Sequence, residues 1–341
     1  MLKNIRFTFQ EFSDPDWGCL DTFERTYVPD EIFAPVIATV EQFAPRILSY
    51  EAVINRAERD AVMNQKWAWP EVTAFVSTLW HGLDARRAAC FDNAVESAQI
   101  KIADMDAGRG GGSCGPDFID FRRDGTLNDP VCLAHESGHL TANLMRDDPD
   151  DGGLPWNMAE MPAFFMQERA YDILQASADT PGMRSAVNLH RLCEYTNLLA
   201  RIPFCLWGLD QGKGQGDSNL RDRFHAWSVD DESTIGRFER WHDADGDSLS
   251  HKAQMLHAHP LSGLLMIEFY QRFKKAAPEM QEKMLSALYD QGARASLVDV
   301  LEAFGVRDEA DLKQAAEQAC QNLADEINRC GFRASAPVVR P

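Results

Sequence analysis

The sequence predicts a mainly α-helical protein with one short β-strand or hairpin, and three observations support this. Apolar residues recur at spacings of three and four along 30–63, 71–105 and 309–330, which is the period of an amphipathic helix. Glycine and proline flank the short alternating run 117–121 within residues 106–130, as expected of a strand bounded by turns. The composition is 45% hydrophobic and 26% charged over 341 residues, enough for a substantial core.

The predicted helices differ in how clearly they are bounded. Residues 30–63 contain Pro35 and Pro45, so we expect shorter helices there rather than one continuous helix. Residues 71–105 read as a long helical stretch. Residues 309–330 form a single amphipathic helix rich in strong helix formers, before a frayed tail.

Charge and composition also limit the class of protein. The formal net charge is −19, which argues against a nucleic-acid partner. No run approaches the ~18 apolar residues of a membrane span, and the first residues lack a secretory signal pattern. The eight cysteines form no CxxC pair, which favours reduced thiols. We therefore expect a cytoplasmic protein that does not associate with membranes, with signal-independent export left open.

The segment "CLAHESGHL" places two histidines four residues apart on a predicted helix. Asp129 is a favourable N-cap and Pro130 suits the first helical position. Residues four apart share a helix face, so His135 and His139 can reach one metal ion. Glu136 can then take a proton from the metal-bound water. The alternative is a histidine pair satisfied by hydrogen bonds in the core. The capped helix and the Gly-rich segment before it favour zinc.

A third ligand is expected from a second helix that opens at Pro155. Glu160 lies in its first turns, 25 positions beyond His135, and a reversing loop can return its carboxylate to the histidines. Pro162 is close enough to the helix start for its missing N–H to cost little. Glu168 is the rival ligand, but it lies two turns further along the helix.

Three segments together resemble the thimet oligopeptidase and oligoendopeptidase F family of zinc metallopeptidases. They are "GRGGGSCGPDFIDFRRDGTLNDPVCLAHESGHL" at 108–140, "PWNMAEMPAFFMQE" at 155–168, and the helical residues 284–327. The likeness extends from about residue 75 to 330. It implies a helical zincin, a neurolysin-like catalytic domain with a small β-strand or hairpin at the edge of the active site.

The resemblance also implies roles for individual residues. A Zn²⁺ ion would be held by His135, His139 and Glu160, with Glu136 as general base and acid. An extended peptide would pair with the main chain of a strand, for which the candidates are Phe118, Ile119, Asp120 and Phe121. The family usually has a polar residue three positions after the ligand glutamate, where this chain has Ala163.

The family also has a segment in which histidine and proline precede clustered tyrosines that help to stabilise the oxyanion. The matching stretch is "LHAHPLSGLLMIEFYQRF" at 256–273, which keeps His257, His259 and Pro260. Serine, glycine and leucine stand where tyrosines are expected, and Tyr270 is the only tyrosine nearby. The catalytic candidates in this stretch are therefore His257, His259 and Tyr270, and the alternative for the histidines is a polar helix start.

These expectations define a zinc-dependent metallopeptidase that acts on oligopeptides or an exposed protein segment. Family members are usually longer and carry an N-terminal lobe over the channel, so a more open site is expected. The alternative is a pseudo-peptidase that binds zinc and peptide without turnover. We divide the chain into an N-terminal helical segment of unknown role (1–70), a metallopeptidase-like domain (71–331) and a tail (332–341).

Overall fold

The computed structural model describes residues 30–106, 110–145, 156–212, 246–290 and 297–332. The described helices are α2 (Asp30–Leu48), α3 (Glu51–Met63), α4 (Trp69–His81), α5 (Ala85–Glu96), α6 (Asn128–Leu144), α7 (Trp156–Ser177), α8 (Pro181–Gly212), α11 (Gly246–Lys275), α12 (Pro278–Tyr289), α13 (Leu297–Ala303) and α14 (Glu309–Arg329). The strands are β1 (Ile100–Asp104), β2 (Gly111–Cys114) and β3 (Ile119–Arg123). The chain is thus mainly helical with a small sheet, as the sequence predicts.

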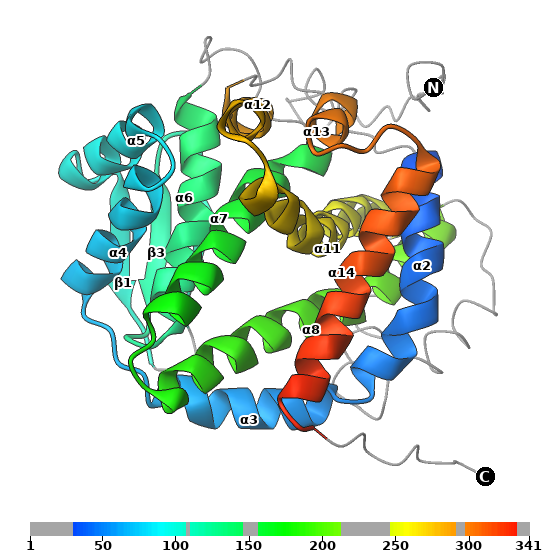
Figure 1. Cartoon of the computed structure of the whole chain (residues 1–341), viewed down its shortest axis with the longest axis horizontal. Coiled ribbons are helices and arrows are strands. Elements are labelled where there is room, and N and C mark those ends of the chain that lie inside the picture. The colour runs from blue at the N-terminus through cyan, green and yellow to red at the C-terminus, as the bar shows by residue number, and fades with distance from the viewer. Residues whose placement is uncertain (1–29, 107–109, 146–155, 213–245, 291–296, 333–341) are drawn as a thin grey trace.

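The helices are arranged so that α6 and α7 lie between two groups of elements (Figure 1). The sheet, α4 and α5 lie on one side, and α2 and α14 lie on the other. Helix α2 packs on α14 and α8, and α3 packs on α8. The buried side chains of α2 belong to the same hydrophobic core as those of α14, so residues 30–63 are part of the main body. None of the described helices combines the length and apolar character needed to cross a membrane.

The stretch 71–105, predicted as helical, contains two helices and a strand. Helix α4 ends before Gly82, and the Asp84 carboxylate caps α5 by accepting from the backbone N–H groups of Arg86 (2.9 Å) and Arg87 (3.2 Å). Residues Ile100–Asp104 then form β1. Their alternating β-branched side chains suit a strand, and pairing with β3, distant in sequence, decides the outcome.

The sheet has the strand order β1-β3-β2. Strand β3 pairs in parallel with β1, with Ile100 opposite Ile119, and antiparallel with β2, with Gly112 opposite Phe121. Ile119 and Phe121 are buried, and successive side chains of a strand point to opposite faces. The sheet therefore has one face packed against the body, close to α6, and one outer face.

The turn before α6 holds two buried carboxylates close together. Asp129 accepts hydrogen bonds from the backbone N–H groups of Asp124 (3.0 Å) and Gly125 (2.8 Å). Asp124 accepts from the N–H (3.0 Å) and hydroxyl (2.7 Å) of Thr126, and from the N–H of Gly110 (3.3 Å). The helix begins one residue before Asp129, so its carboxylate does not occupy the predicted N-cap position. It ties the start of α6 to the turn after β3, and Asp124 links that turn to Gly110, just before β2.

The pKa of Asp129 should make this turn sensitive to pH. Burial and the adjacent Asp124 charge raise the pKa of Asp129 from 3.8 to about 6, against the opposing effect of the two backbone hydrogen bonds. Its stabilising contribution is therefore present below pH 3.8 and is lost as the pH rises through about 6. At ~1.4 kcal/mol per pKa unit, the loss is at most about 3 kcal/mol.

Urea unfolding between pH 4 and 8 tests this expectation. The unfolding free energy of the wild type, relative to that of Asp129→Asn, should fall as the pH rises, because the amide cannot ionise. A difference that stays constant or grows with pH contradicts the assignment.

Candidate metal centre

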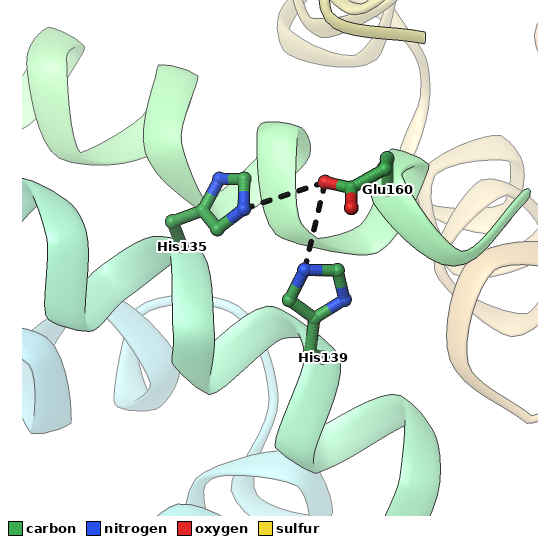
Figure 2. A group of neighbouring side chains, drawn as sticks. All are labelled: His135, His139 and Glu160. Atoms are coloured by element: carbon green, nitrogen blue, oxygen red, sulfur yellow. Dashed lines mark ion pairs between the residues drawn. The ribbon is translucent and has the colours of Figure 1, made fainter. Parts of the chain in front are cut away.

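Three side chains from two helices converge on one point (Figure 2). The Oε2 atom of Glu160 on α7 lies 3.4 Å from the Nε2 atom of His135 and 3.6 Å from that of His139, both on α6. The three side chains are between 14% and 17% exposed. The point where they meet is therefore largely, but not completely, shielded from solvent.

This spacing fits a tetrahedral zinc ion. Bonds of about 2.0–2.1 Å in a tetrahedral arrangement separate neighbouring ligand atoms by about 3.3–3.4 Å. The measured 3.4 and 3.6 Å are close to that separation. Two imidazoles and one carboxylate are also a donor set that zinc accepts while keeping a position open for water or substrate. Within the described part of the chain, no other group of His, Cys, Asp and Glu meets the same geometric requirement.

The two helices can approach closely because residue 138 is glycine. A Cβ atom placed there would lie 2.5 Å from the backbone oxygen of Pro162 and 2.6 Å from the Cα atom of Ala163. Gly138 lies between the two histidines in sequence, and Glu160 lies two residues before Pro162. The crossing of α6 and α7 therefore positions all three predicted ligands, and a glycine inside a helical pattern is a signal that could have indicated it.

Further contacts fix the backbone around this crossing. The indole N–H of Trp80 donates to the Ser137 hydroxyl (3.0 Å), and the Tyr289 hydroxyl donates to the Pro162 carbonyl (2.8 Å). The rings of Trp80 and Tyr289 meet edge to face at 5.3 Å, and the Arg87 guanidinium lies over the Tyr289 ring. Helices α4, α5 and α12 therefore hold the segments of α6 and α7 that carry the site.

The side chain of Glu136, on α6, is buried against strand β2. It is 7% exposed, and a Cβ atom on Gly112 would lie only 2.5 Å from its Cγ atom. Burial raises the pKa of Glu136, and the Glu160 carboxylate adds to this, while His135 and His139 oppose it. A carboxylate with a raised pKa accepts a proton more readily near neutral pH. The predicted proton carrier thus depends on a glycine in β2 that local sequence patterns did not single out.

Gln167 holds the far side of one histidine. Its Oε1 atom lies 2.8 Å from the Nδ1 atom of His135, and it is 5% exposed. In the neutral ring, donation of Nδ1–H to this oxygen leaves the lone pair on Nε2, the nitrogen that faces Glu160. Ala163, at the position where the family usually has a polar residue, lies in the contact with Gly138. The orienting role falls one turn further along α7.

The ion pair with Glu160 changes the protonation of His135. Burial alone would lower the pKa of His135, but the hydrogen bond and negative charge of Glu160, with smaller contributions from Glu136 and Gln167, raise it to about 9. In the metal-free state the imidazolium is therefore favoured near neutral pH, so a proton and a metal ion compete for this nitrogen.

The rival ligand Glu168 belongs to a separate buried ion-pair network. It is 2% exposed and accepts from the Arg191 guanidinium at 2.9 and 2.8 Å and from the Tyr195 hydroxyl at 2.7 Å. Arg191 also pairs with Glu326. These contacts join α7, α8 and α14, and they leave Glu160 as the carboxylate of the metal group.

The structure does not bring Tyr270 to the metal group. Its side chain is 1% exposed, and its hydroxyl donates to Asp172 at 3.3 Å, twelve residues beyond Glu160 on α7 and hence about 18 Å along that helix. Gly263 faces the core, where a Cβ atom would lie 2.7 Å from Leu198 and 2.9 Å from Phe164. This face of α11 is filled by helix packing, so its tyrosine cannot serve the predicted oxyanion role.

His257 and His259 fall within α11, but their side chains lie outside the described part of the structure. Their predicted catalytic role stays a prediction. Each is separated by at most three positions from Pro260, the first residue of α11 whose burial is described, and Pro260 is buried.

The predicted peptide-binding strand is at the centre of the sheet rather than at its edge. Strand β3, which contains Ile119, Asp120 and Phe121, is paired on both sides, and Phe118 lies just before it. Its backbone groups are therefore already used, because the unpredicted strand β1 occupies one side. The edge beside Glu136 belongs to β2, and no described strand pairs with the outer edge of β2.

Comparison with known structures supports the fold assignment. The chain is similar to a Bacillus anthracis str. Ames protein assigned as an oligoendopeptidase F (TM-score 0.60, 15% identity, covering 92% of this chain and 59% of the other). It is also similar to PZ peptidase A with a bound inhibitor (0.57, 11%, 90% and 60%) and to oligoendopeptidase F from Enterococcus faecium (0.54, 14%, 92% and 56%). The chain thus has the oligoendopeptidase F fold and spans less than two thirds of the length of these proteins.

No protein-family model and no curated protein matches the amino-acid sequence. At identities of 11–15%, the structural likeness establishes the fold alone. What the site does must be argued from its own residues.

We expect Gly138→Ala to disrupt the crossing of α6 and α7. The added methyl group would overlap backbone atoms that cannot rotate away, so the unfolding free energy should fall by about 1–3 kcal/mol although alanine is the better helix former. Zinc affinity should fall with it. The control is Gly182→Ala, where the nearest atom is 3.9 Å away. Equal melting temperatures for the two variants would contradict this account.

We expect Gln167→Leu to weaken zinc binding about 10- to 100-fold, because the His135 ring loses its orienting acceptor. Gln167→Glu should restore or increase the affinity, since a carboxylate accepts the same hydrogen bond. Competition with a chromophoric chelator measures these constants, and Gln318→Leu on the exposed face of α14 is the control. Unchanged affinity in Gln167→Leu would exclude the positioning role.

Proposed function

We propose that this chain is a zinc-dependent peptidase that hydrolyses peptide bonds in oligopeptides or in an exposed segment of a protein. The observation that carries the proposal is the convergence of His135, His139 and Glu160 at zinc-ligand spacing, with Glu136 directly after the first histidine. The oligoendopeptidase F fold is consistent with this activity.

The side chains divide the chemistry between them. Zinc, when bound, would supply Lewis-acid polarisation of the scissile carbonyl and of the attacking water. Gln167 orients His135 through Nδ1, and α7 carries both Gln167 and Glu160. Glu136 would take the proton from the attacking water and pass it to the leaving amine, and its raised pKa suits both transfers.

The outer edge of β2, with which no strand of the described residues pairs, is the candidate for holding substrate. A strand edge offers unpaired N–H and C=O groups to an extended peptide. Gly112 on this strand touches Glu136, so a peptide paired with β2 would lie beside the proposed general base. We therefore assign main-chain binding to Gly111, Gly112 and Ser113 instead of the β3 residues.

A second candidate function is a binding module that holds zinc and peptide without turnover. The burial of Tyr270 against Asp172 favours this candidate, because loss of an oxyanion donor typically lowers the rate ~10²–10³-fold. The buried Glu136 favours the enzyme. A buried carboxylate lowers the stability of the fold, and general-base catalysis gives a reason to keep this residue.

Zinc content and peptide cleavage together separate these candidates. The wild type should hold one equivalent of zinc, measured by elemental analysis, and should cleave members of a fluorogenic peptide library. Glu136→Gln should keep the metal and lose about 10²–10⁴-fold in cleavage rate, whereas His139→Ala should lose the metal. Glu302→Gln changes an exposed carboxylate on α13 and should have no effect.

Each outcome has a distinct meaning for the proposal. Zinc-loaded protein without Glu136-dependent cleavage would exclude the peptidase and leave the binding module. Protein that does not bind zinc would exclude both.

A further inference from the structure

We propose that Arg122 selects an acidic side chain in a peptide bound along the outer edge of β2, with which no described strand pairs. This inference rests on the proposed function, because it names the substrate class of that site. It concerns the outer face of the sheet, on the other side of β2 from Glu136.

The register of the sheet places Arg122 directly beside the edge strand. Gly111 on β2 pairs with Arg122 on β3, and Ser113 pairs with Asp120. These four residues share the outer face, since Gly112 between them points at Glu136 on the inner face. A peptide paired with β2 would alternate in the same way, so every second side chain would lie on the outer face.

The Arg122 side chain extends over the edge strand at Gly111. Its Nη2 atom lies 3.5 Å from the position that a Cβ atom on Gly111 would occupy. The guanidinium therefore lies over β2 on the outer face and extends toward the outer edge of that strand. Since residue 111 is glycine, no side chain of β2 at that position lies between the guanidinium and a bound peptide.

Arg122 also has its hydrogen-bonding capacity available. It is exposed, and among the described residues it has no side-chain hydrogen bond or ion pair. The adjacent Arg123 differs, because its Nη2 atom is 2.9 Å from the Asp104 carboxylate. Arg122 is thus an unpaired cation beside the proposed substrate strand, on a chain whose formal net charge is −19.

Distances between neighbouring strands allow a direct ion pair. Cβ atoms of directly opposed residues lie about 4.5–5.5 Å apart. An Asp or Glu side chain on the peptide residue opposite Gly111 could therefore reach the guanidinium and bind it in a bidentate way. Two residues along the peptide, opposite Ser113, the same face presents Asp120, which would repel an acidic side chain. The selection should consequently depend on position.

Overall charge alone would produce the opposite result. A protein with a net charge of −19 repels acidic peptides at long range. A preference for an acidic side chain at one position therefore requires a local cation, and Arg122 meets that requirement at β2.

The test is peptide binding to the zinc-loaded Glu136→Gln protein, measured by fluorescence anisotropy so that turnover is not needed. Peptides of one length would carry a single Asp or Asn, moved along the sequence one position at a time. We expect about fivefold tighter binding of Asp than Asn at one position. Weaker binding of Asp is expected two residues away.

The variants identify the group responsible. Arg122→Gln should remove the preference, Arg122→Lys should retain part of it, and Arg123→Gln should leave it unchanged. Melting temperatures would verify that each variant is folded. Equal affinity for Asp and Asn at all positions, a preference that survives Arg122→Gln, or no peptide binding at all would overturn the inference.

The outcomes for the inference and for the proposed function are separable. If Glu136→Gln binds the Asp peptide through Arg122 but the zinc-loaded wild type does not cleave it, the peptidase proposal fails and the binding inference stands. If the wild type cleaves peptides without an Arg122-dependent preference, the peptidase stands and the inference fails.

Discussion

The close contact between α6 and α7 at Gly138 is the constraint on which the site depends. The contact brings the backbone of Pro162 and Ala163 against the turn that joins His135 to His139. Residues two turns apart on α7 then face α6 together, which is why the candidate ligand Glu160 and the side chain of Gln167 both reach His135. A wider crossing would separate the ligand carboxylate from both imidazoles at once.

The fold shows where local patterns suffice and where they do not. The period of apolar residues predicts helices such as α14 because an amphipathic face needs no knowledge of its partner. Strand β1 was missed because residues 100–104 become a strand only by pairing with β3, which lies beyond a second strand. The same pairing moved β3 from the edge to the centre of the sheet, so one missed strand changed the predicted surface for peptide binding.

For the candidate site, too, sequence patterns predict some of the residues and miss others. His135 and His139 follow from a spacing of four on one helix, and the length of the connection indicates Glu160. Gln167 and Gly112 could not be found in this way, because their roles arise only where α7 and β2 meet α6.

The charges buried at the crossing favour binding of a cation. Glu136 and Glu160 bring two carboxylates into a region where water is largely excluded, and two neutral imidazoles cannot compensate them. In the metal-free state a proton on His135 supplies part of the missing charge, which is the reason for its raised pKa. A divalent ion at the same point would replace that proton, neutralise both carboxylates and satisfy the separations of the three ligand atoms. Two carboxylates and two imidazoles in this buried place would be unfavourable in a helix pair with a purely structural role. The same four side chains suit a metal centre.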